Sequence, residues 1–456
     1  MLTVIILAAG KGTRMKSENP KVLFEAAGKP MIDYTIEISK KLNPHKIVVV
    51  TGNASEKVKE HLKNQSVEFA LQETQKGTAD AVLSAKDYIQ DNGKILILCG
   101  DMPLITYETL NDFINTVKED IAFISVKMDN PKGYGRVIRS SNNSIIKIVE
   151  EKDADEYEKK VNEINTGVYF CSAKELKSRL AEIDNNNAQK EYYLTDIVKN
   201  GAEAFLAKDE KEFMGVNDRI QLSVAGKLLW QKRAEEHMKN GVTIIDPSQC
   251  YIDSNVEIGS DTIIYPNVFI EKNTKIGKNV TIGLGCKIVN TIIEDNVEIK
   301  DNSYIEKSFI GKGSSIGPMA HLRPDSYLCG DNKVGNFVEL KKAKLGVGSK
   351  ASHLTYLGDA TLGENVNIGC GTITCNYDGY NKYETHIGNN VFVGSDTQLV
   401  APVTVGDNVL IAAGSTVTKD VPKNALAISR TNQNNLDNKG KEIMDINKAK
   451  KENSKK

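Results

Sequence analysis

The sequence predicts two folded parts: a doubly wound, Rossmann-like α/β domain, followed by a solenoid of hexapeptide repeats. Three observations predict this division. Residues 1–218 alternate short apolar runs with helix-like stretches. The second half follows a period of six, in which isoleucine occupies seven successive sixth positions from 252 to 288. A helix expected from about Asp218 to Asn240 separates the two patterns, and Gly241 is well placed just past its end.

Seven short runs in the first half are candidate strands. Several are continuous stretches of Val, Ile and Leu, which are typical of strands buried on both faces of a parallel sheet. Their alternation with helical stretches predicts a doubly wound α/β domain. The candidate strands are Thr3–Ala8, Lys46–Thr51, Val67–Leu71, Lys94–Cys99, Ile121–Lys127, Ile145–Glu150 and Gly167–Cys171.

The linking helix is predicted from apolar residues at helical spacing: Ile220, Val224, Leu228 and Leu229. We therefore place a first domain at residues 1–229, a linker helix at 230–250 and the repeat domain at 251–456.

The repeat of six residues predicts a solenoid in which each hexad forms one flat side and a turn, with the apolar residue pointing inward. Three hexads make one coil of about eighteen residues. The eighteen residues between Ile368 and Ile387 interrupt the pattern and are expected to loop out. The chain from about residue 437 lacks apolar periodicity and is expected to be a disordered, solvated tail.

Charge and composition exclude several classes of protein. Lys and Arg number 59 against 60 Asp and Glu, so we expect no nucleic-acid partner. No apolar run approaches the length of a membrane span, and the apolar N-terminal stretch is too short for a signal peptide. The seven cysteines form no C-x-x-C pair, which indicates reduced thiols rather than disulfides or a zinc knuckle. We therefore expect a cytoplasmic protein.

The first predicted strand ends in the motif L-A-A-G-K-G-T-R-M, followed by Pro20 and Lys21. Small residues let backbone N–H groups approach phosphate oxygens, and Arg14 and Lys21 would supply the charge that a triphosphate needs. The alternative is a tight turn with two solvated cations. The motif is neither a P-loop nor a G-x-G-x-x-G turn.

Asp101 follows the buried strand Lys94–Cys99, at the edge where α/β sheets bind ligands. A carboxylate there suits Mg²⁺, which takes one or two protein oxygens besides phosphates and water. A turn or helix-cap role for Asp101 is equally consistent with its position. Asn217, in G-V-N-D-R, is by itself a candidate helix cap.

Together, L-A-A-G-K-G-T-R-M, the P-K pair and the hexapeptide half resemble one family over roughly residues 1–430. It is the family of bifunctional N-acetylglucosamine-1-phosphate uridyltransferases and glucosamine-1-phosphate acetyltransferases. The resemblance implies a nucleotidyltransferase domain joined to a left-handed parallel β-helix that assembles as a homotrimer. It implies synthesis of UDP-N-acetylglucosamine, a cell-envelope precursor, from UTP, acetyl-CoA and glucosamine 1-phosphate, with Mg²⁺ as cofactor and no membrane partner.

The resemblance assigns residues to the uridyl-transfer site. It implies catalysis by Lys21 and Arg14 and Mg²⁺ ligation by Asp101 and Asn217. Cys99 departs from the pattern, since other members carry tyrosine there. The residues implied for nucleotide and sugar binding are Leu7, Ala8, Ala9, Gly10, Lys21, Gln72, Gly77, Thr78, Gly135, Glu150, Asn165 and Asn217.

A polar cluster late in the repeat indicates a second site. His353 lies among Arg323, Lys341 and Tyr356 of neighbouring coils. Regular coils of eighteen residues would stack Arg323, Lys341 and residue 359, and two stacked cations favour an anion between them. An imidazole, whose pKa is ordinarily about 6.5, suits a general base.

The resemblance gives these residues roles. His353 would be the general base that deprotonates the C2 amine, oriented by Glu339. A direct attack on the thioester is implied, without an acyl-cysteine at Cys370. The residues implied for glucosamine phosphate are Arg323, Lys341, Tyr356 and Asn367, and those for acetyl-CoA are Cys370, Asn376, Tyr377, Ser395, Ala413 and Arg430.

Two other functions stay open at this stage. One is a single nucleotidyltransferase activity, such as a glucose-1-phosphate adenylyltransferase, with an inert solenoid; His353, Asn376, Tyr377 and Arg430 argue against it. The other is a non-catalytic assembly protein, against which the intact N-terminal motif and Asp101 argue.

Overall fold

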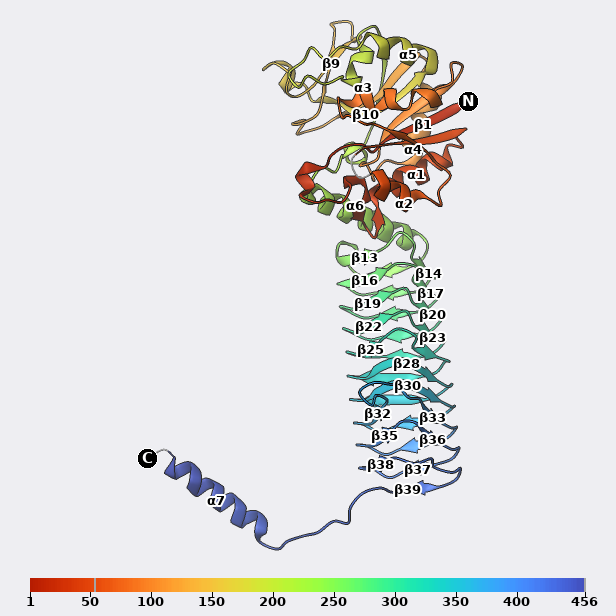
Figure 1. Cartoon of the computed structure of the whole chain (residues 1–456), viewed down its shortest axis with the longest axis vertical. Helices are drawn as coiled ribbons and strands as arrows, with labels where there is room; N and C mark the ends of the chain where they lie inside the picture. The colour runs from red at the N-terminus through yellow and green to blue at the C-terminus, as the bar shows by residue number, and fades with distance from the viewer. Residues whose placement is uncertain (53–54, 455–456) are drawn as a thin grey trace. The chain divides into compact units, whose positions relative to one another are not determined.

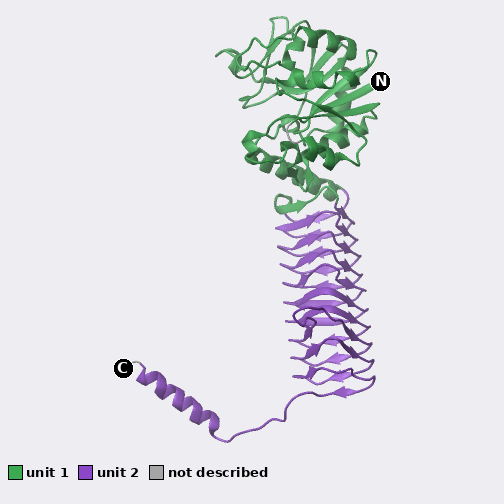
Figure 2. Ribbon diagram, in the orientation of Figure 1, with its two compact units in different colours: residues 1–239, 247–255 green, residues 240–246, 256–456 purple. Residues whose placement is uncertain are grey.

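The structure is a computed structural model that describes residues 1–52 and 55–454. The chain forms two compact units, coloured separately in Figure 2. The first comprises residues 1–239 and 247–255, and the second comprises residues 240–246 and 256–456. Helix α6 runs from Arg219 to Lys239 and belongs to the first unit. The helix expected from about Asp218 to Asn240 is therefore present and ends two residues before Gly241, which has a φ of +90°. The linker bounds of 230–250 are corrected, because the helix begins earlier and ends at Lys239.

The first unit is built on a mixed sheet of nine strands in the order β11-β7-β10-β6-β1-β4-β5, with β8 and β9 attached beside β10 (Figure 1). All seven predicted strands are present. The sheet is not wholly parallel, as the apolar runs suggested, because β10 runs antiparallel to both β6 and β7. The strands are β1 Leu2–Leu7, β4 Lys46–Thr51, β5 Glu68–Leu71, β6 Lys94–Cys99, β7 Ile121–Lys127, β8 Arg136–Arg139, β9 Ile145–Val149, β10 Glu163–Ser172 and β11 Glu203–Leu206.

Helices cover both faces of this sheet, so successive side chains of the central strands enter different cores. Val4 and Ile6 of β1 pack with α1, α2 and α4, whereas Ile5 packs with α3 and α5. This burial on both faces explains the continuous apolar runs. The helices are α1 Met31–Lys41, α2 Ser55–Leu62, α3 Thr78–Ser84, α4 Tyr107–Thr116 and α5 Ala173–Glu182.

Helix α6 buries small residues rather than the apolar stripe expected from its sequence. Its buried positions are Ala225, Gly226, Ala234 and His237. Ile220, by contrast, is 77% exposed, and Val224 is also exposed. The long α6 therefore approaches its neighbours closely through small side chains.

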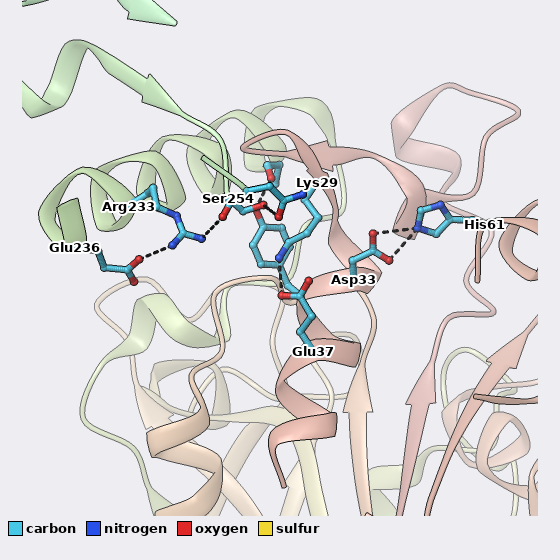
Figure 3. Close-up of polar contacts among 10 residues, drawn as sticks. Lys29, Asp33, Glu37, His61, Arg233, Glu236 and Ser254 are labelled. Carbon is cyan, nitrogen blue, oxygen red and sulfur yellow. Dashed lines mark hydrogen bonds and ion pairs between the residues drawn. The ribbon is translucent and has the colours of Figure 1, made fainter. Parts of the chain in front are cut away.

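Ion pairs around α1 and α6 fix the segment that returns to the first unit. Figure 3 shows Arg233 of α6 between Glu236 and Ser254: the guanidinium contacts the carboxylate at 2.7 Å and donates to the Ser254 carbonyl at 2.9 Å. Lys29 pairs with Glu37 at 2.6 Å nearby. Residues 247–255, which include β13 (Cys250–Ile252), are thus anchored to α6.

The second unit is a parallel β-helix of short strands stacked in register. One face consists of β12 Thr243–Ile244, β15 Ile263–Ile264, β18 Thr281–Ile282, β21 Glu298–Ile299, β24 Ser315–Ile316, β27 Lys333–Asn336, β29 Lys350–His353, β31 Asn367–Ile368, β34 Phe392–Val393, β37 Leu410–Ile411 and β39 Leu426–Ala427. The other faces consist of β14 Glu257–Ile258, β16 Val268–Glu271, β17 Lys275–Ile276, β19 Lys287–Val289, β20 Ile292–Ile293, β22 Tyr304–Glu306, β23 Phe309–Ile310, β25 His321–Leu322, β26 Tyr327–Leu328, β28 Glu339–Leu345, β30 Tyr356–Leu362, β32 Ile373–Cys375, β33 Thr385–Ile387, β35 Gln398–Val400, β36 Val403–Val405 and β38 Thr416–Val417.

The period-six apolar residues point inward, as predicted. Ile264, Ile282 and Ile299 occupy equivalent positions of successive coils and are fully buried. The first two are eighteen residues apart and the next two seventeen, so the coil length is not constant. This variation shifts the alignment of residues that a strict eighteen-residue repeat would stack.

Two further segments complete the chain. The predicted loop after Ile368 contains a bridge between Tyr377 and Lys382, so it forms a small structured protrusion. The expectation of a disordered tail from about 437 is wrong for most of that segment, because Lys439–Asn453 forms helix α7, although every residue of it is exposed. The segment is rich in Lys, Glu and other helix formers, which accounts for a helix without a packed face. Residues 455 and 456 lie outside the described part.

Within that described part, no helix is long and apolar enough to cross a membrane. All seven cysteines are free thiols.

Candidate active sites

A pocket of about 280 Å³ opens at the carboxyl ends of β1 and β6. The order of the sheet brings these strand ends together, which is the usual ligand position in an open α/β sheet. Sequence reasoning missed four lining residues that carry no motif of their own: Val22, Gln75, Ala81 and Glu191. Cys99, noted as a departure from the family pattern, also lines the pocket. The predicted residues that line the pocket are Leu7, Ala8, Ala9, Gly10, Lys21, Gln72, Gly77, Thr78 and Asp101.

Lys21 joins the two predicted metal ligands. Its ammonium group forms an ion pair with the Asp101 carboxylate and donates to Asn217 Oδ1 at 3.0 Å. The backbone N–H of Val216 donates to the Asp101 carbonyl at 3.0 Å, which brings residue 217 beside Asp101. One carboxylate and one amide oxygen therefore converge on a single cation. This donor set fits Mg²⁺, which prefers hard oxygen ligands and completes its shell with phosphates and water.

At another wall of the pocket, side-chain amides are fixed by hydrogen bonds. The buried Gln72 donates from Nε2 to the Gly77 carbonyl at 3.1 Å and to the Asp80 carboxylate at 2.7 Å. Gly77 has a φ of +125°, and a Cβ there would lie 2.4 Å from the Tyr192 carbonyl oxygen. Any Cβ at this position would overlap the backbone of Tyr192, so only glycine can occupy residue 77, directly before α3.

The predicted sugar-binding residues lie close together: Gly135 directly precedes β8, Glu150 directly follows β9, and Asn165 lies on β10. The Asn165 backbone N–H donates to the Gly135 carbonyl at 2.8 Å. A Cβ on Gly135 would lie 3.6 Å from the Glu150 carboxylate. Burial raises the pKa of Glu150, against the opposing effect of a hydrogen bond from Thr195.

Arg14 of the motif and Cys99 at the end of β6 differ from the residues that the sequence predicted to bind the nucleotide. Arg14 lies in the short 3₁₀ helix Thr13–Met15, whose buried residue is Met15; Arg14 itself is exposed and is not among the residues that line the pocket. Cys99 lines the pocket beside Leu7, and burial raises the pKa of its thiol to about 12.

In the solenoid, Asn336 holds His353. The two residues are in register on β27 and β29, and Nδ1 of the ring lies 2.9 Å from Asn336 Oδ1. An amide oxygen accepts only, so this contact favours a proton on Nδ1. Glu339, which the resemblance implies as the residue that orients the ring, is in register with Tyr356, and its carboxylate pairs with Arg323 at 2.8 Å.

Arg323 and Lys341, the two cations expected to stack, each form an ion pair with a carboxylate of the protein. Lys341 lies one coil beyond Arg323, as predicted, but it is in register with Gly358 rather than residue 359, since this coil is one residue shorter. Lys341 Nζ nevertheless reaches the Asp359 carboxylate at 2.9 Å. Burial alone would raise the pKa of Asp359, but hydrogen bonds from Lys341 and Asn376 lower it.

A third cation stands beside this pair. Lys382 comes from the protruding loop, and its contact with the Lys341 ammonium lowers the pKa of Lys382. Two ammonium groups that approach each other favour an anion between them. Sequence reasoning missed Lys382, because its approach depends on the fold of the loop.

Tyr356 and Asn376 close the cluster. A Cβ at Gly358 would lie 2.2 Å from the Tyr356 hydroxyl and 2.8 Å from Asn376 Nδ2, so this glycine leaves room for both. Tyr377 follows on the loop and is exposed. Among the described residues, no side-chain hydrogen bond joins Asn367, on β31, to this cluster.

Four of the residues expected to bind acetyl-CoA form a column along successive turns. The Asp396 N–H donates to the Cys370 carbonyl at 2.7 Å, and the Gly414 N–H donates to the Ser395 carbonyl at 2.8 Å. Arg430 donates to the Ala413 carbonyl at 2.7 Å. Cys370, Ser395, Ala413 and Arg430, although far apart in sequence, therefore lie along one edge of the solenoid.

Comparison with known proteins agrees with this geometry. Residues 3–215 match the nucleotidyl transferase family, residues 246–350 match the GMPPB C-terminal domain, and residues 384–419 match the bacterial transferase hexapeptide repeats. The chain is 51% identical over 445 residues to the bifunctional protein GlmU of Geotalea daltonii, covering 95% of this chain and 97% of that protein. It is 48% identical over 441 residues to the same protein of Staphylococcus epidermidis, with coverages of 94% and 97%.

The chain belongs to the bifunctional GlmU family. Both halves of the family are present, so the chain is a transferase with a nucleotidyltransferase domain and a hexapeptide-repeat transferase domain. The parallel β-helix of the second unit is accordingly the left-handed helix of hexapeptide transferases.

Proposed function

We propose that this GlmU-family protein makes UDP-N-acetylglucosamine in two steps, acetyl transfer to glucosamine 1-phosphate and then uridyl transfer to the acetylated product. The observation that carries the proposal is the convergence of Lys21, Asp101 and Asn217 in a pocket walled by the L-A-A-G backbone. A second polar cluster around His353 supports the other activity. The free thiols support a reducing, cytoplasmic setting, in which the product supplies cell-envelope synthesis.

In the uridyl-transfer step, an oxygen of the sugar 1-phosphate attacks the α-phosphorus of UTP, and pyrophosphate leaves. The backbone N–H groups of Ala9 and Gly10 would meet the phosphates, since the N–H of Ala8 already donates to the Val50 carbonyl at 2.9 Å, and Lys21 would contribute a positive charge. Gln72, with its amide group fixed, reads the base. Bound Mg²⁺, held by Asp101 and Asn217, would neutralise phosphate charge. Catalysis is then positioning and charge stabilisation, without a covalent enzyme intermediate.

In the acetyl-transfer step, Nε2 of His353 takes a proton from the C2 ammonium group, and the free amine attacks the thioester carbonyl. The new C–N bond replaces the C–S bond, and coenzyme A leaves as a thiol after taking up a proton. Asn336 keeps the other ring nitrogen protonated, which leaves Nε2 free as the base. Arg323, Lys341 and Lys382 are placed to bind the phosphate, in exchange for their contacts with protein carboxylates.

The coenzyme is proposed to lie along the column of Cys370, Ser395, Ala413 and Arg430. These exposed turns lie on successive coils, one above another, so an extended molecule could bind along the edge that they form. We further propose a homotrimer, with sites completed between neighbouring solenoids, because the His353 cluster lies on the surface of a single chain.

Product analysis tests the proposal. The protein is incubated with glucosamine 1-phosphate, acetyl-CoA and UTP, supplied together and in each pairwise omission. We expect UDP-N-acetylglucosamine only from the complete mixture, and N-acetylglucosamine 1-phosphate when UTP is omitted. Uridyl transfer without any acetyl transfer would instead identify a single nucleotidyltransferase activity with an inert solenoid.

A further inference from the structure

Arg136 is a fully buried cation beside the proposed sugar site. Its side chain is 2% exposed, at the start of β8, and it directly follows Gly135. One Nη group pairs with the Glu151 carboxylate at 2.7 Å, and the other donates to the Tyr134 carbonyl. Within the described part of the chain, its Nε has no hydrogen-bond partner. Burying a guanidinium group with one donor unsatisfied is costly, so the position needs a compensating role.

Glu151 holds both ends of the short loop that leads into β8. The same carboxylate oxygen that pairs with Arg136 accepts a hydrogen bond from the Gly133 backbone N–H at 3.0 Å. The Gly133 hydrogen bond and the Arg136 charge together lower the pKa of Glu151, so it is ionised at neutral pH. The Glu151 side chain thus contacts both the first and the last residue of the segment 133–136.

This loop faces the sugar site on one side and the metal ligands on the other. Gly135 lies against Glu150, and its carbonyl accepts the Asn165 N–H. The Tyr134 side chain packs against the apolar cluster that contains Met102, the neighbour of Asp101, and Phe213. Gly133 to Arg136 therefore join the wall of the sugar site to the segment that carries a ligand of Mg²⁺.

We propose that Arg136 and Glu151 form a positioning pair that sets residues 133–136 as the wall of the sugar 1-phosphate site and aligns that wall with Asp101 and Asn217. Neither side chain reaches the reacting atoms. They act through the backbone of Gly133 and Gly135 and through the Tyr134 contact. The inference rests on the proposed uridyl-transfer function and adds two residues to it.

Strand β8 supplies a matched control. Arg139, three residues along, pairs with the partly buried Glu163 at 2.7 Å in a fork-like contact through two nitrogens. That pair contacts none of residues 133–136. Loss of either pair removes a buried charge contact from the same strand, but only one of them fixes the loop.

The test compares Glu151→Gln and Arg136→Lys with Glu163→Gln and Arg139→Lys in the full-length protein. Glu151→Gln is the milder change, since its amide oxygen can still accept from Gly133. Steady-state uridyl transfer is measured with N-acetylglucosamine 1-phosphate and UTP varied in turn. Acetyl transfer and thermal unfolding are measured on the same preparations.

A shift of the wall should lower kcat/KM for the sugar phosphate about 10- to 100-fold in Glu151→Gln and Arg136→Lys, because a misplacement of about 1 Å is enough for such a loss. The KM for UTP should stay within about twofold, and acetyl transfer should not change. The control variants should lower thermal stability alone. Equal losses for both substrates, or equal effects in the two pairs, would assign Arg136 a merely structural role and overturn the inference. A parent protein without uridyl transfer would instead overturn the proposed function.

Discussion

Lys21 occupies an unusual place, because its single ammonium group contacts both proposed ligands of the metal. Such a contact neutralises Asp101 when no other cation is bound, and it keeps the carboxylate and the Asn217 amide oxygen directed at one point. When phosphates and Mg²⁺ enter, the lysine can turn to the phosphates while the two oxygens hold the metal ion. The site is therefore organised before the substrate arrives.

This organisation makes the charge of Asp101 essential. Asp101→Asn keeps the shape of the side chain but removes the anion that balances Mg²⁺. We expect uridyl transfer to fall at least about 100-fold, while acetyl transfer by the other domain continues. Pyrophosphate release at limiting Mg²⁺ measures the first activity and thiol release the second. Unchanged uridyl transfer would assign Asp101 to the turn alone.

His353 separates a bifunctional enzyme from one with an inert solenoid. Without a general base the amine stays largely protonated, and removal of such a base typically costs about 10²- to 10⁴-fold in rate. We expect a loss of acetyl transfer in that range for His353→Ala, with uridyl transfer from N-acetylglucosamine 1-phosphate unchanged. Asn336→Ala should give a smaller loss, since the ring remains but its tautomer is no longer fixed. Free coenzyme A is measured with a thiol reagent. Full acetyl transfer in His353→Ala would remove the base assignment.

Burial also determines which thiols can react. The pKa of Cys99 and Cys171 is raised to about 12, and that of Cys286 to about 11, by burial. Since the thiolate is the reactive form, iodoacetamide at pH 8 should leave the buried Cys171 and Cys286 unmodified in the folded protein and modify them after unfolding. Mass spectrometry of the peptides measures this. Rapid alkylation of Cys171 in the folded protein would contradict its burial.

At the residue scale, the position of a motif along the chain predicted which residues line the pocket. The expected stacking of coils did not predict which side chain contacts His353. Residues 7–10, Lys21 and Asp101 could be placed from the sequence, because strand ends in an open sheet meet at one edge. The partner of His353 could not. Whether Asn336 or Glu339 faces the ring depends on the register of individual coils, and that register changes where a coil has seventeen residues rather than eighteen.

At the scale of elements, the solenoid depends on tight turns that bring backbone segments of adjacent coils into contact. Asn279 and Asn296 take left-handed conformations at equivalent turns of successive coils, which asparagine tolerates better than most residues. Glycines stand where the next coil passes closest. At Gly346 an added Cβ would lie 2.3 Å from the Gly363 carbonyl oxygen. The recurrent I-G pairs of the sequence thus mark close approach as well as repeat phase.

This packing predicts opposite effects for two glycines. Gly346→Ala forces the backbone of adjacent coils apart, so we expect it to destabilise the second unit by about 1–3 kcal/mol. Gly440 lies in the exposed helix α7, where an added Cβ would meet no atom within 4 Å, so Gly440→Ala should be neutral or strengthen that helix slightly. Circular dichroism during thermal unfolding compares the two variants. A Gly346→Ala protein as stable as the parent would contradict the close approach.

Elements were predicted well where the pattern was periodic and poorly where it was not. β4, β6 and β7 match the expected ranges, since uninterrupted apolar runs define buried strands. β10 is longer than expected, because polar residues such as Asn165 within it interrupt the apolar pattern. Its antiparallel direction depends on the path of the chain, which an apolar run does not encode. Helix α7 has no apolar periodicity to reveal it, and its sequence favours helix only through local propensity.

At the scale of the whole molecule, the chain crosses between its two units more than once. It leaves the first unit after Lys239, contributes residues 240–246 to the second, and returns for residues 247–255. The sequence could not reveal this return, because Ile252 fits the period-six pattern and so assigns the segment to the solenoid. Its attachment depends on the hydrogen bond from Arg233 to the Ser254 carbonyl.

Because the two units are interleaved along the chain, the stability of an N-terminal fragment depends on where the chain is cut. A fragment of residues 1–255 keeps all of α6 and the segment anchored to it, so we expect it to fold and to retain uridyl transfer without acetyl transfer. A fragment of residues 1–229 ends inside α6 and lacks Arg233, Glu236 and the returning segment. It should unfold several degrees lower, since a loss of 1 kcal/mol shifts the midpoint by about 2–4 °C for a domain of this size. Both fragments should be monomeric in light scattering if the solenoid carries the proposed trimer. A trimeric 1–255 fragment would move the assembly surface to the first unit, and equal stability of the two fragments would show that residues 230–255 do not support its fold.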